Sequence, residues 1–182
     1  LLDEGVDVDG EGLWTPLDEA LYWAKFDIAQ MLVDRRAHIR ALSTAAGLGD
    51  VELIAGFFEG EVLAAAAGPI GSPFSDTVPD ELARDPQSIL DHAFVMAVNA
   101  GQRVAAEDLL GRGAEINARP PGFHWRGTAL HAAVWRGDST LVTWLMSSGS
   151  DPSICDGLAD SDAAGWANHH GHPELLTLLE GS

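Results

Sequence analysis

Two helices and the turn between them are encoded in the stretch Gly127-Thr128-Ala129-Leu130-His131-Ala132-Ala133-Val134-Trp135-Arg136-Gly137-Asp138 and in the residues that follow it. Thr128 can cap the first helix by accepting a backbone N–H, and Gly137 stands where a helix ends in a left-handed residue. A second helix then runs through the apolar positions of 141–145 until Gly149 ends it in the same way. The unit is therefore helix, turn, helix, loop.

The same elements recur along the chain, and the copies align on the turn position and on the apolar residue eight positions later. The copies are 14–20 with Leu32, 41–46 with Phe57, 93–97 with Leu109, 128–133 with Leu145 and 162–167 with Leu179. A sixth, partial copy is expected in Leu1–Asp9, which matches the end of a second helix and its outgoing loop. Because the chain also begins without Met, we expect further residues to precede it.

A repeat of about 33 residues with a T-P-L-H-x-A signature is typical of ankyrin repeats. The segment from Gly127 to Gly149 resembles this family closely, with Ala129 in place of the proline, and Thr15-Pro16-Leu17 resembles it at the start of the first full copy. The resemblance implies an all-α ankyrin-repeat solenoid of about five full copies, forming a single domain over 1–182. It also implies that His131 and His172 have structural roles.

The spacing of the copies is uneven. Leu109, Leu145 and Leu179 follow one another at 36 and 34 residues (145 − 109 and 179 − 145), whereas Leu32 and Phe57 are only 25 apart (57 − 32). The first two full copies should therefore lack the long loop between them. The interval from Phe57 to Leu109 is 52 (109 − 57), and we place the excess in an insertion over 59–88, which contains four prolines. This insertion is either a tolerated surface loop or a partner-contacting one, and 62–67 has room for a turn or two of helix.

The net charge of −18 is concentrated at the two ends, since no Lys or Arg precedes Lys25 or follows Arg136. Such a charge disfavours nucleic acid as a partner. It favours either solubility or the steering of a basic protein partner. No apolar run approaches the roughly 18 residues of a membrane span. The single cysteine, Cys155, cannot form an internal disulfide and fits either a reducing compartment or simple neutrality. We expect a cytoplasmic protein and favour a monomer. The bias to Arg over Lys is common in bacterial genes rich in GC.

The histidines raise the question of an enzyme. His169 and His170 precede a turn glycine, and a zinc site with a carboxylate such as Asp138 is one alternative, which would make the chain a metal-dependent hydrolase. Adjacent helical residues point about 100° apart, which is awkward for joint ligation. Cys155 lies among acidic residues, which should raise the pKa of its thiol. The chain has no metal or phosphate motif. We therefore expect no catalysis, no metal and no cofactor.

The resemblance implies a non-enzymatic scaffold that binds a folded protein partner through a concave stripe formed by the two residues before each turn, and through loop tips. Aromatic residues and arginine are enriched in the energetic centres of protein interfaces. The predicted partner-binding residues are Trp135, Arg136, Trp125, His124, Tyr22, Trp23, Asn99, His169 and His170. In the other interpretation Trp125 closes its loop, Tyr22 and Trp23 cover a neighbouring unit, and Trp144 and Trp166 belong to the core. A second hypothesis is an inhibitory or immunity-type protein that blocks a cationic target.

Overall fold

The computed structural model describes residues 7–74 and 78–180. Within these ranges the chain is mostly helical, as expected, with a single two-stranded hairpin. The hairpin corrects the expectation of a purely α-helical chain. The expected partial copy in 1–9 falls largely outside the described residues, as do positions 75–77 of the insertion.

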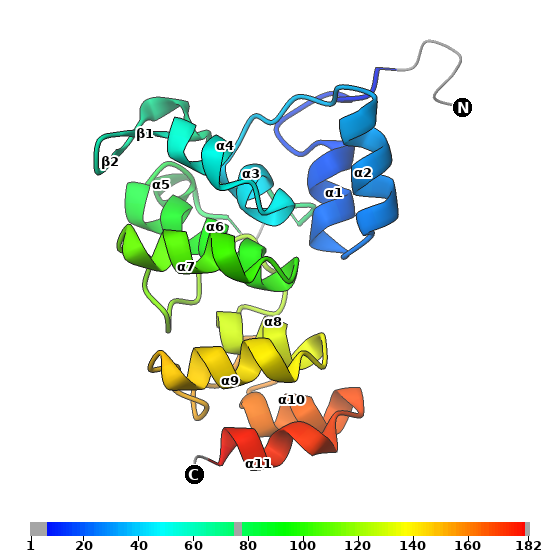
Figure 1. The fold of residues 1–182 in the computed structure, drawn as a ribbon, viewed down its shortest axis with the longest axis vertical. Coiled ribbons are helices and arrows are strands. Elements are labelled where there is room, and N and C mark those ends of the chain that lie inside the picture. Colours follow the sequence, from blue (N-terminus) through cyan, green and yellow to red (C-terminus); the bar gives the residue numbers. More distant parts are fainter. Residues whose placement is uncertain (1–6, 75–77, 181–182) are drawn as a thin grey trace.

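The helices form successive pairs, each joined by a tight turn. The pairs are α1 (Pro16–Tyr22) with α2 (Phe26–Asp34), α3 (Leu42–Leu48) with α4 (Val51–Gly56), α6 (Pro86–Asn99) with α7 (Arg103–Gly111), α8 (Ala129–Trp135) with α9 (Ser139–Ser147), and α10 (Ala163–His170) with α11 (Leu176–Leu179). A 3₁₀ turn, Pro173–Leu175, leads into α11. The first helices of the pairs contact one another in the order α1, α3, α6, α8, α10, so the pairs follow one another through the molecule (Figure 1).

Side chains cap the first helices of the pairs, with the exception of α3, which begins after Ala41. The Thr15 hydroxyl accepts a hydrogen bond from the Asp18 backbone N–H at 3.1 Å, and the Asp18 carboxylate accepts one from the Thr15 N–H at 3.0 Å. At α8 the backbone N–H of Thr128 donates to Nδ1 of His131 at 3.1 Å. The structural role of His131 is therefore confirmed, and its Nε2 also lies 3.2 Å from the carbonyl oxygen of Ser161 in the next unit.

Each turn between paired helices passes through a left-handed residue. Gly49, Gly101, Gly137 and Gly171 have φ between 68° and 80°, and Ala24 occupies the same place with φ 52°. Gly137 also has no room for a side chain, because a Cβ there would lie 2.5 Å from the ring of His172. Backbone conformation therefore favours glycine at these turns, and packing adds a second requirement at Gly137.

The second helices contribute a recurring buried position to the core. Leu32, Leu109, Leu145 and Leu179 are at most 5% exposed. Phe57 does not follow this pattern, because α4 ends at Gly56 and Phe57 becomes its half-buried C-cap. Ile54, with no exposed surface, is instead the buried apolar residue of α4.

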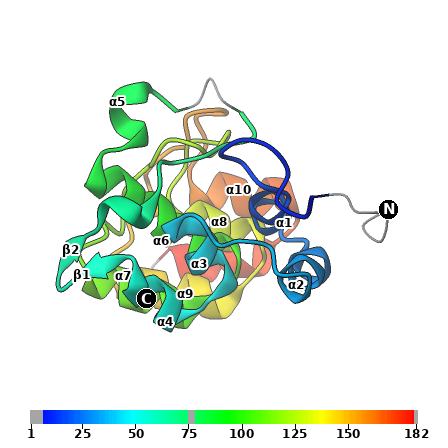
Figure 2. The same cartoon turned by 90° about the horizontal axis from the view of Figure 1, so that it is seen from above.

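The two departures in spacing have different structures. Only residues 35–41 connect α2 to α3, which confirms that the first junction lacks a long loop. The insertion contains β1 (Phe58–Glu59), which pairs antiparallel with β2 (Val62–Leu63), then a 3₁₀ turn Ala65–Ala67 and the short helix α5 (Asp80–Ala83). The expectation of helix over 62–67 is therefore wrong for its first half. Figure 2 shows the hairpin and α5 on the side of the molecule opposite α2.

The insertion ends earlier than 88, since α6 already begins at Pro86. The Asp85 carboxylate caps this helix by accepting the Ser88 N–H at 2.8 Å. Pro86 occupies the first helical position, where its missing N–H costs nothing. The resulting helix has 14 residues, twice the length of α1, α3 or α8.

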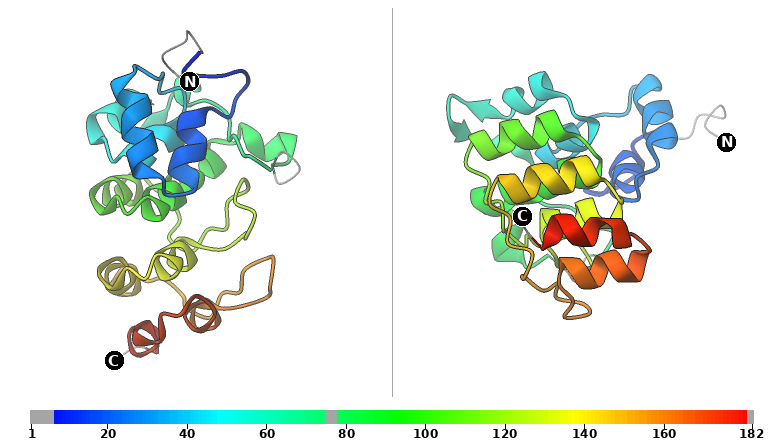
Figure 3. Two further views of the ribbon diagram at one scale, coloured as in Figure 1. Left: turned by 90° about the vertical axis from the view of Figure 1, so that its right-hand side faces the viewer. Right: turned by 60° about the horizontal axis from the view of Figure 1, so that its bottom comes forward.

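The long loops 112–128 and 148–162 project side by side from one flank of the molecule (Figure 3). Asn117 joins them, because its side chain donates to the Gly149 carbonyl at 3.2 Å and accepts from the Asp151 N–H at 2.9 Å. Asp9 accepts the His38 N–H at 2.7 Å in the same manner. The hydrogen bonds of Asn117 fix the loops 112–128 and 148–162 relative to one another, and both loops contribute to the site described next.

Candidate functional site

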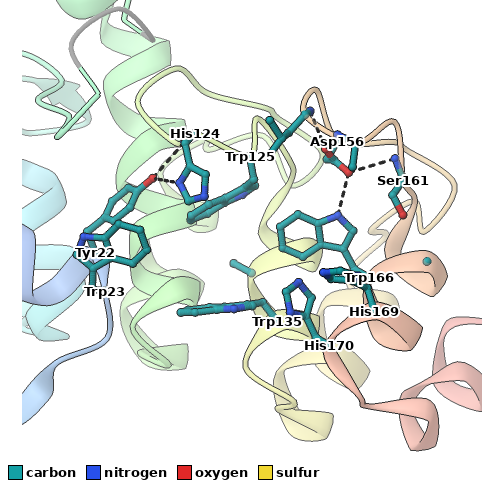
Figure 4. Close-up of a pocket in the computed structure, with 14 residues that line it drawn as sticks. Tyr22, Trp23, His124, Trp125, Trp135, Asp156, Ser161, Trp166, His169 and His170 are labelled. Atoms are coloured by element: carbon teal, nitrogen blue, oxygen red, sulfur yellow. Dashed lines mark hydrogen bonds between the residues drawn. The ribbon is translucent and has the colours of Figure 1, made fainter.

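A pocket of 520 Å³ lies where the ends of α1, α8 and α10 meet the two projecting loops (Figure 4). Aromatic rings make up most of its wall. The aromatic and histidine side chains that line it are Tyr22, Trp23, His124, Trp125, Trp135, Trp166, His169 and His170. We call it the aromatic pocket. Its volume falls in the range of small-molecule and cofactor sites, roughly 300 to 1,000 Å³.

Each wall of the aromatic pocket comes from a different part of the chain. Tyr22 and Trp23 end α1, and Trp135 ends α8. His124 and Trp125 come from the loop 112–128. Trp166, His169 and His170 lie on α10, while Asp156, Leu158, Ala159 and Ser161 come from the loop 148–162. The site therefore depends on the packing of three helix pairs.

Tyr22 contacts several other residues on one side of the aromatic pocket. It is 1% exposed, and its ring stacks on Phe123 with 5.7 Å between centroids and 13° between planes. Its hydroxyl oxygen accepts the backbone N–H of His124 at 3.1 Å and lies 2.7 Å from Nδ1 of the same residue. Burial raises the pKa of Tyr22 to about 12. The phenol is therefore neutral and holds the loop 112–128 against α1.

Tryptophan rings continue this packing across the molecule. Trp125 is only 6% exposed and contacts Tyr22 and Trp166 at centroid distances of 5.6 and 6.4 Å. Its burial favours the interpretation in which Trp125 closes its own loop. Trp23, in contrast, is 38% exposed, and its indole N–H donates to the Glu19 carboxylate at 2.7 Å. Buried rings thus support partly exposed ones.

Asp156 is the acidic residue of the aromatic pocket, and it is buried. One carboxylate oxygen accepts the backbone N–H groups of Leu158 and Ala159, both at 2.7 Å. The other accepts the Ser161 N–H at 3.1 Å and the Trp166 indole N–H at 2.8 Å. Burial acts to raise the pKa of Asp156, but these hydrogen bonds outweigh it and lower the pKa below its usual value. A fixed negative charge therefore lies in the wall.

Two histidines of the wall, His124 and His170, add no fixed positive charge. Among the residues that the structure describes, no Lys or Arg lines the aromatic pocket. Burial lowers the pKa of His124 and of His170, so both rings are uncharged at neutral pH. The Cys155 thiol lies outside the lining, and its pKa is raised by desolvation and by nearby acids, as its sequence neighbours predicted.

Seven of the nine predicted partner-binding residues line the aromatic pocket: Trp135, Trp125, His124, Tyr22, Trp23, His169 and His170. Tyr22 and Trp125 do so as buried residues, which corrects the expectation that their side chains are presented on the surface. His169 is exposed, and Trp135 is half-buried.

Asn99 and Arg136 pack between helices of the stack instead, Asn99 as a buried residue and Arg136 as a half-buried one. The Asn99 side chain has no exposed surface and donates to the Tyr22 carbonyl at 2.9 Å. Arg136 donates to the Asn99 carbonyl at 3.0 Å, and its guanidinium lies over the Phe26 ring, 5.6 Å from the centroid. Asn99 joins α6 to α1, and Arg136 joins the end of α8 to α6 and to α2, because the first helix pair packs closely against the later ones. The burial of Asn99 does not fit the expectation that it meets a partner, whereas for Arg136 that expectation stays a prediction.

Asp156 and Trp166 are lining residues that the sequence interpretation did not select. A signal for Trp166 existed, since it precedes His170 by four positions and helical residues at that spacing share a face. The ring centroids of Trp166 and His170 are 5.2 Å apart. Trp166 is half-buried rather than fully packed in the core, and so is Trp144. No comparable signal existed for Asp156, whose place depends on the loop conformation.

Metal binding finds no support in the geometry. Over 7–74 and 78–180, no three side chains of His, Cys, Asp or Glu are placed to hold a metal ion. The rings of His169 and His170 are 4.9 Å apart and nearly perpendicular. Across the same ranges no helix combines the length and apolar character needed to cross a membrane.

Comparison with known proteins identifies the repeat. A family model described as ankyrin repeats (many copies) matches residues 94–146, which run from within α6 to within α9. No curated protein gives a significant match to the chain. Ankyrin repeats generally mediate protein–protein interactions and are typically non-enzymatic. The T-A-L-H-A-A motif at 128–133, the left-handed turns and the matched segment agree, and residues 94–146 are identified as ankyrin repeats.

Proposed function

We propose that this protein is a non-enzymatic scaffold of five stacked ankyrin-type units that binds a folded protein partner on the face that carries the aromatic pocket. One observation carries the proposal: aromatic side chains from α1, α8, α10 and the loop 112–128 converge on that single face. A wall assembled from three helix pairs is costly to maintain without a ligand, because large aromatic groups left partly exposed forgo hydrophobic burial. We take the loops 112–128 and 148–162 as part of the same contact surface.

The aromatic pocket has the properties of an interface centre. Trp23 and Trp135 are partly exposed, whereas the residues behind them, Tyr22 and Trp125, are buried and fix their surroundings. Large, rigid aromatic groups lose little conformational entropy on binding, and a few such residues commonly contribute 2 kcal/mol or more each. A partner that inserts a side chain between these rings therefore gains affinity without ordering the scaffold.

Charge favours a basic partner. The chain carries a net charge of −18, and Asp156 is the acidic residue within a wall whose described residues include no Lys or Arg. Complementary charge raises the association rate and is screened by salt, with a Debye length of about 8 Å at physiological ionic strength. The same charge favours a second candidate function, the blocking of a cationic target. In either case, association should weaken sharply as salt is raised.

The test is capture of the partner from the native lysate with the wild type, a Trp23→Ala, Trp135→Ala variant and a Trp144→Ala variant. Trp144 is the matched control, because it is a half-buried tryptophan on α9 that does not line the aromatic pocket. We expect a protein retained by the wild type and by Trp144→Ala but lost with the double variant. Circular dichroism must show that all three proteins are equally folded. Equal retention by all three would place the binding surface elsewhere, with the insertion as the next candidate.

A further inference from the structure

The aromatic pocket has a wall suited to a cation rather than to a neutral group. In Figure 4, Trp23, Trp125, Trp135 and Trp166 surround the same space. The face of an aromatic ring carries negative potential, and tryptophan attracts cations most strongly among the side chains. Four indole rings around one space are therefore an environment in which a positive charge is stabilised from several directions.

Two of these rings are made more electron-rich by their hydrogen bonds. The indole N–H of Trp166 donates to Asp156 at 2.8 Å, and that of Trp23 donates to Glu19 at 2.7 Å. Donation to a carboxylate polarises the indole and pushes electron density toward the ring. Asp156 and Glu19 thus act on the aromatic pocket both through their own charge and through the rings. Over the described part of the chain, no Lys or Arg in the lining opposes them.

The hydrogen-bonding capacity of the wall distinguishes between kinds of cation. Arginine brings five N–H donors and a primary ammonium brings three, and each donor needs an acceptor when it leaves water. The Asp156 carboxylate offers about four lone-pair positions, and all four are filled by Leu158, Ala159, Ser161 and Trp166. Nδ1 of His124 is already engaged by the Tyr22 hydroxyl. The other side-chain acceptors of the lining are the Ser161 hydroxyl and histidine ring nitrogens, which are neutral and do not supply the charged acceptor that an N–H cation pairs with best. A cation without N–H groups makes no such demand.

We propose that the aromatic pocket binds a small molecule with a quaternary ammonium head, of the choline type. Its methyl groups pack on the indole faces while its charge is stabilised by the rings and by the saturated Asp156 carboxylate. The volume of 520 Å³ accommodates a whole small molecule rather than a head group alone, which favours a free ligand over a methylated side chain of a partner. This inference goes beyond the scaffold function, since the ligand need not belong to a partner.

The experiment is a titration of the purified full chain with choline, followed by isothermal calorimetry and by intrinsic tryptophan fluorescence. Two probes of similar shape serve as controls. Ethanolamine keeps the charge but restores the N–H donors, and 3,3-dimethyl-1-butanol keeps the shape of choline without its charge. We expect choline to bind at least about fivefold more tightly than either control, the preference for aromatic cation recognition. Equal affinity for the neutral isostere, or no binding of choline, would overturn the proposal.

Variants locate the site. Trp135→Leu removes an indole face while it keeps an apolar side chain, and we expect choline affinity to fall about five- to thirtyfold. Trp144→Leu, outside the lining, should bind choline as the wild type does. Asp156→Asn should weaken binding too, but it also disturbs the loop 148–162, so Trp135→Leu remains the deciding variant. Unchanged affinity in Trp135→Leu would overturn the assignment to this pocket.

A peptide that carries trimethyllysine separates the two sources of the same head group. Weaker binding of this peptide than of choline supports the free ligand, and tighter binding overturns that part of the proposal. These titrations involve no protein partner. Loss of choline binding and loss of partner capture are therefore independent results.

Discussion

The hydroxyl oxygen of Tyr22 accepts the backbone N–H of His124 at 3.1 Å, although the two residues lie 102 positions apart in the sequence. The contact joins the end of α1 to the loop that enters α8, past the units between them. It is possible because only seven residues, 35–41, separate α2 from α3, and because Gly47 lets α3 approach its neighbours closely: a Cβ there would lie 3.1 Å from Leu21 and 3.3 Å from Met96. The short junction therefore creates one side of the aromatic pocket.

Titration of the tyrosine absorbance should report this contact directly. Tyr22 is the single tyrosine of the chain, so the ultraviolet signal of phenolate formation belongs to one residue. Burial raises its pKa to about 12, from 10 in an exposed tyrosine. Because the unfolded chain ionises first as pH rises, this group lowers the stability of the fold above pH 10 and up to about 12. A midpoint near 10 under folded conditions would mean that Tyr22 is exposed.

Removal of the Tyr22 hydroxyl should loosen the loop 112–128 and leave the aromatic ring packed in the core. In Tyr22→Phe the ring still stacks on Phe123, but the His124 N–H loses its acceptor. An unsatisfied buried donor costs about 1 to 3 kcal/mol, and because His124 is only half-buried we expect about 1 kcal/mol in the free energy of unfolding. Urea denaturation measures the change. Hydrogen exchange at residues 122–126 should accelerate in the variant, and unchanged exchange would contradict the role assigned to the hydroxyl.

The sequence was sufficient to predict the helix pairs, because their signals are local. Caps such as Thr15 and Thr128, and turn glycines such as Gly137, act on residues within one or two turns of themselves. The short first junction also followed from spacing alone. The hairpin of β1 and β2 was missed, because two residues per strand leave no periodic pattern to detect.

The sequence predicted most of the residues that line the aromatic pocket, but it did not predict which of them are buried. Trp23 and Trp135 stand at register positions that a repeat presents on one face, whichever units surround them. The burial of Tyr22 and Asn99 instead depends on how far the first unit approaches α6 and the loop 112–128, which spacing does not encode. Asp156 was missed for the same reason, since its place depends on the path of a long loop.

Glycine in place of Ala24 should stabilise the protein. Ala24 has φ 52° at the turn where four equivalent positions carry glycine, and a left-handed alanine costs roughly 1 kcal/mol. Part of that gain is offset by the greater freedom of glycine in the unfolded chain, so we expect Ala24→Gly to raise the free energy of unfolding by about 0.5 kcal/mol. Thermal and urea denaturation would show it.

The reverse substitution, alanine for glycine at the equivalent turn position Gly101, serves as the control for Ala24→Gly. At Gly101, with φ 77°, a Cβ would also lie 2.6 Å from the guanidinium of Arg136. Gly101→Ala should therefore destabilise the protein by more than about 1 kcal/mol. Equal and small effects of the two substitutions would show that these turns do not depend on left-handed backbone.

Acid should destabilise this fold through His92, which lies inside the stack. Its ring stacks on Phe123 with 4.7 Å between centroids, and its Nε2 is buried without a hydrogen-bond partner among the described residues. Burial lowers the pKa of His92 to about 3. The folded protein therefore keeps His92 neutral, whereas the unfolded chain takes up a proton below about pH 6.5.

Stability should consequently fall as pH drops from about 6.5 toward 3, because the unfolded state binds the extra proton. One such proton contributes at most about 1.4 kcal/mol per pH unit. His92→Leu lacks this proton, so its free energy of unfolding should decline less steeply than that of the wild type between pH 6 and 4, as measured by urea denaturation. At pH 7 neither protein takes up the proton, and the comparison there isolates the packing effect of the substitution. Parallel stability curves for the two proteins would show that His92 is not the buried neutral group.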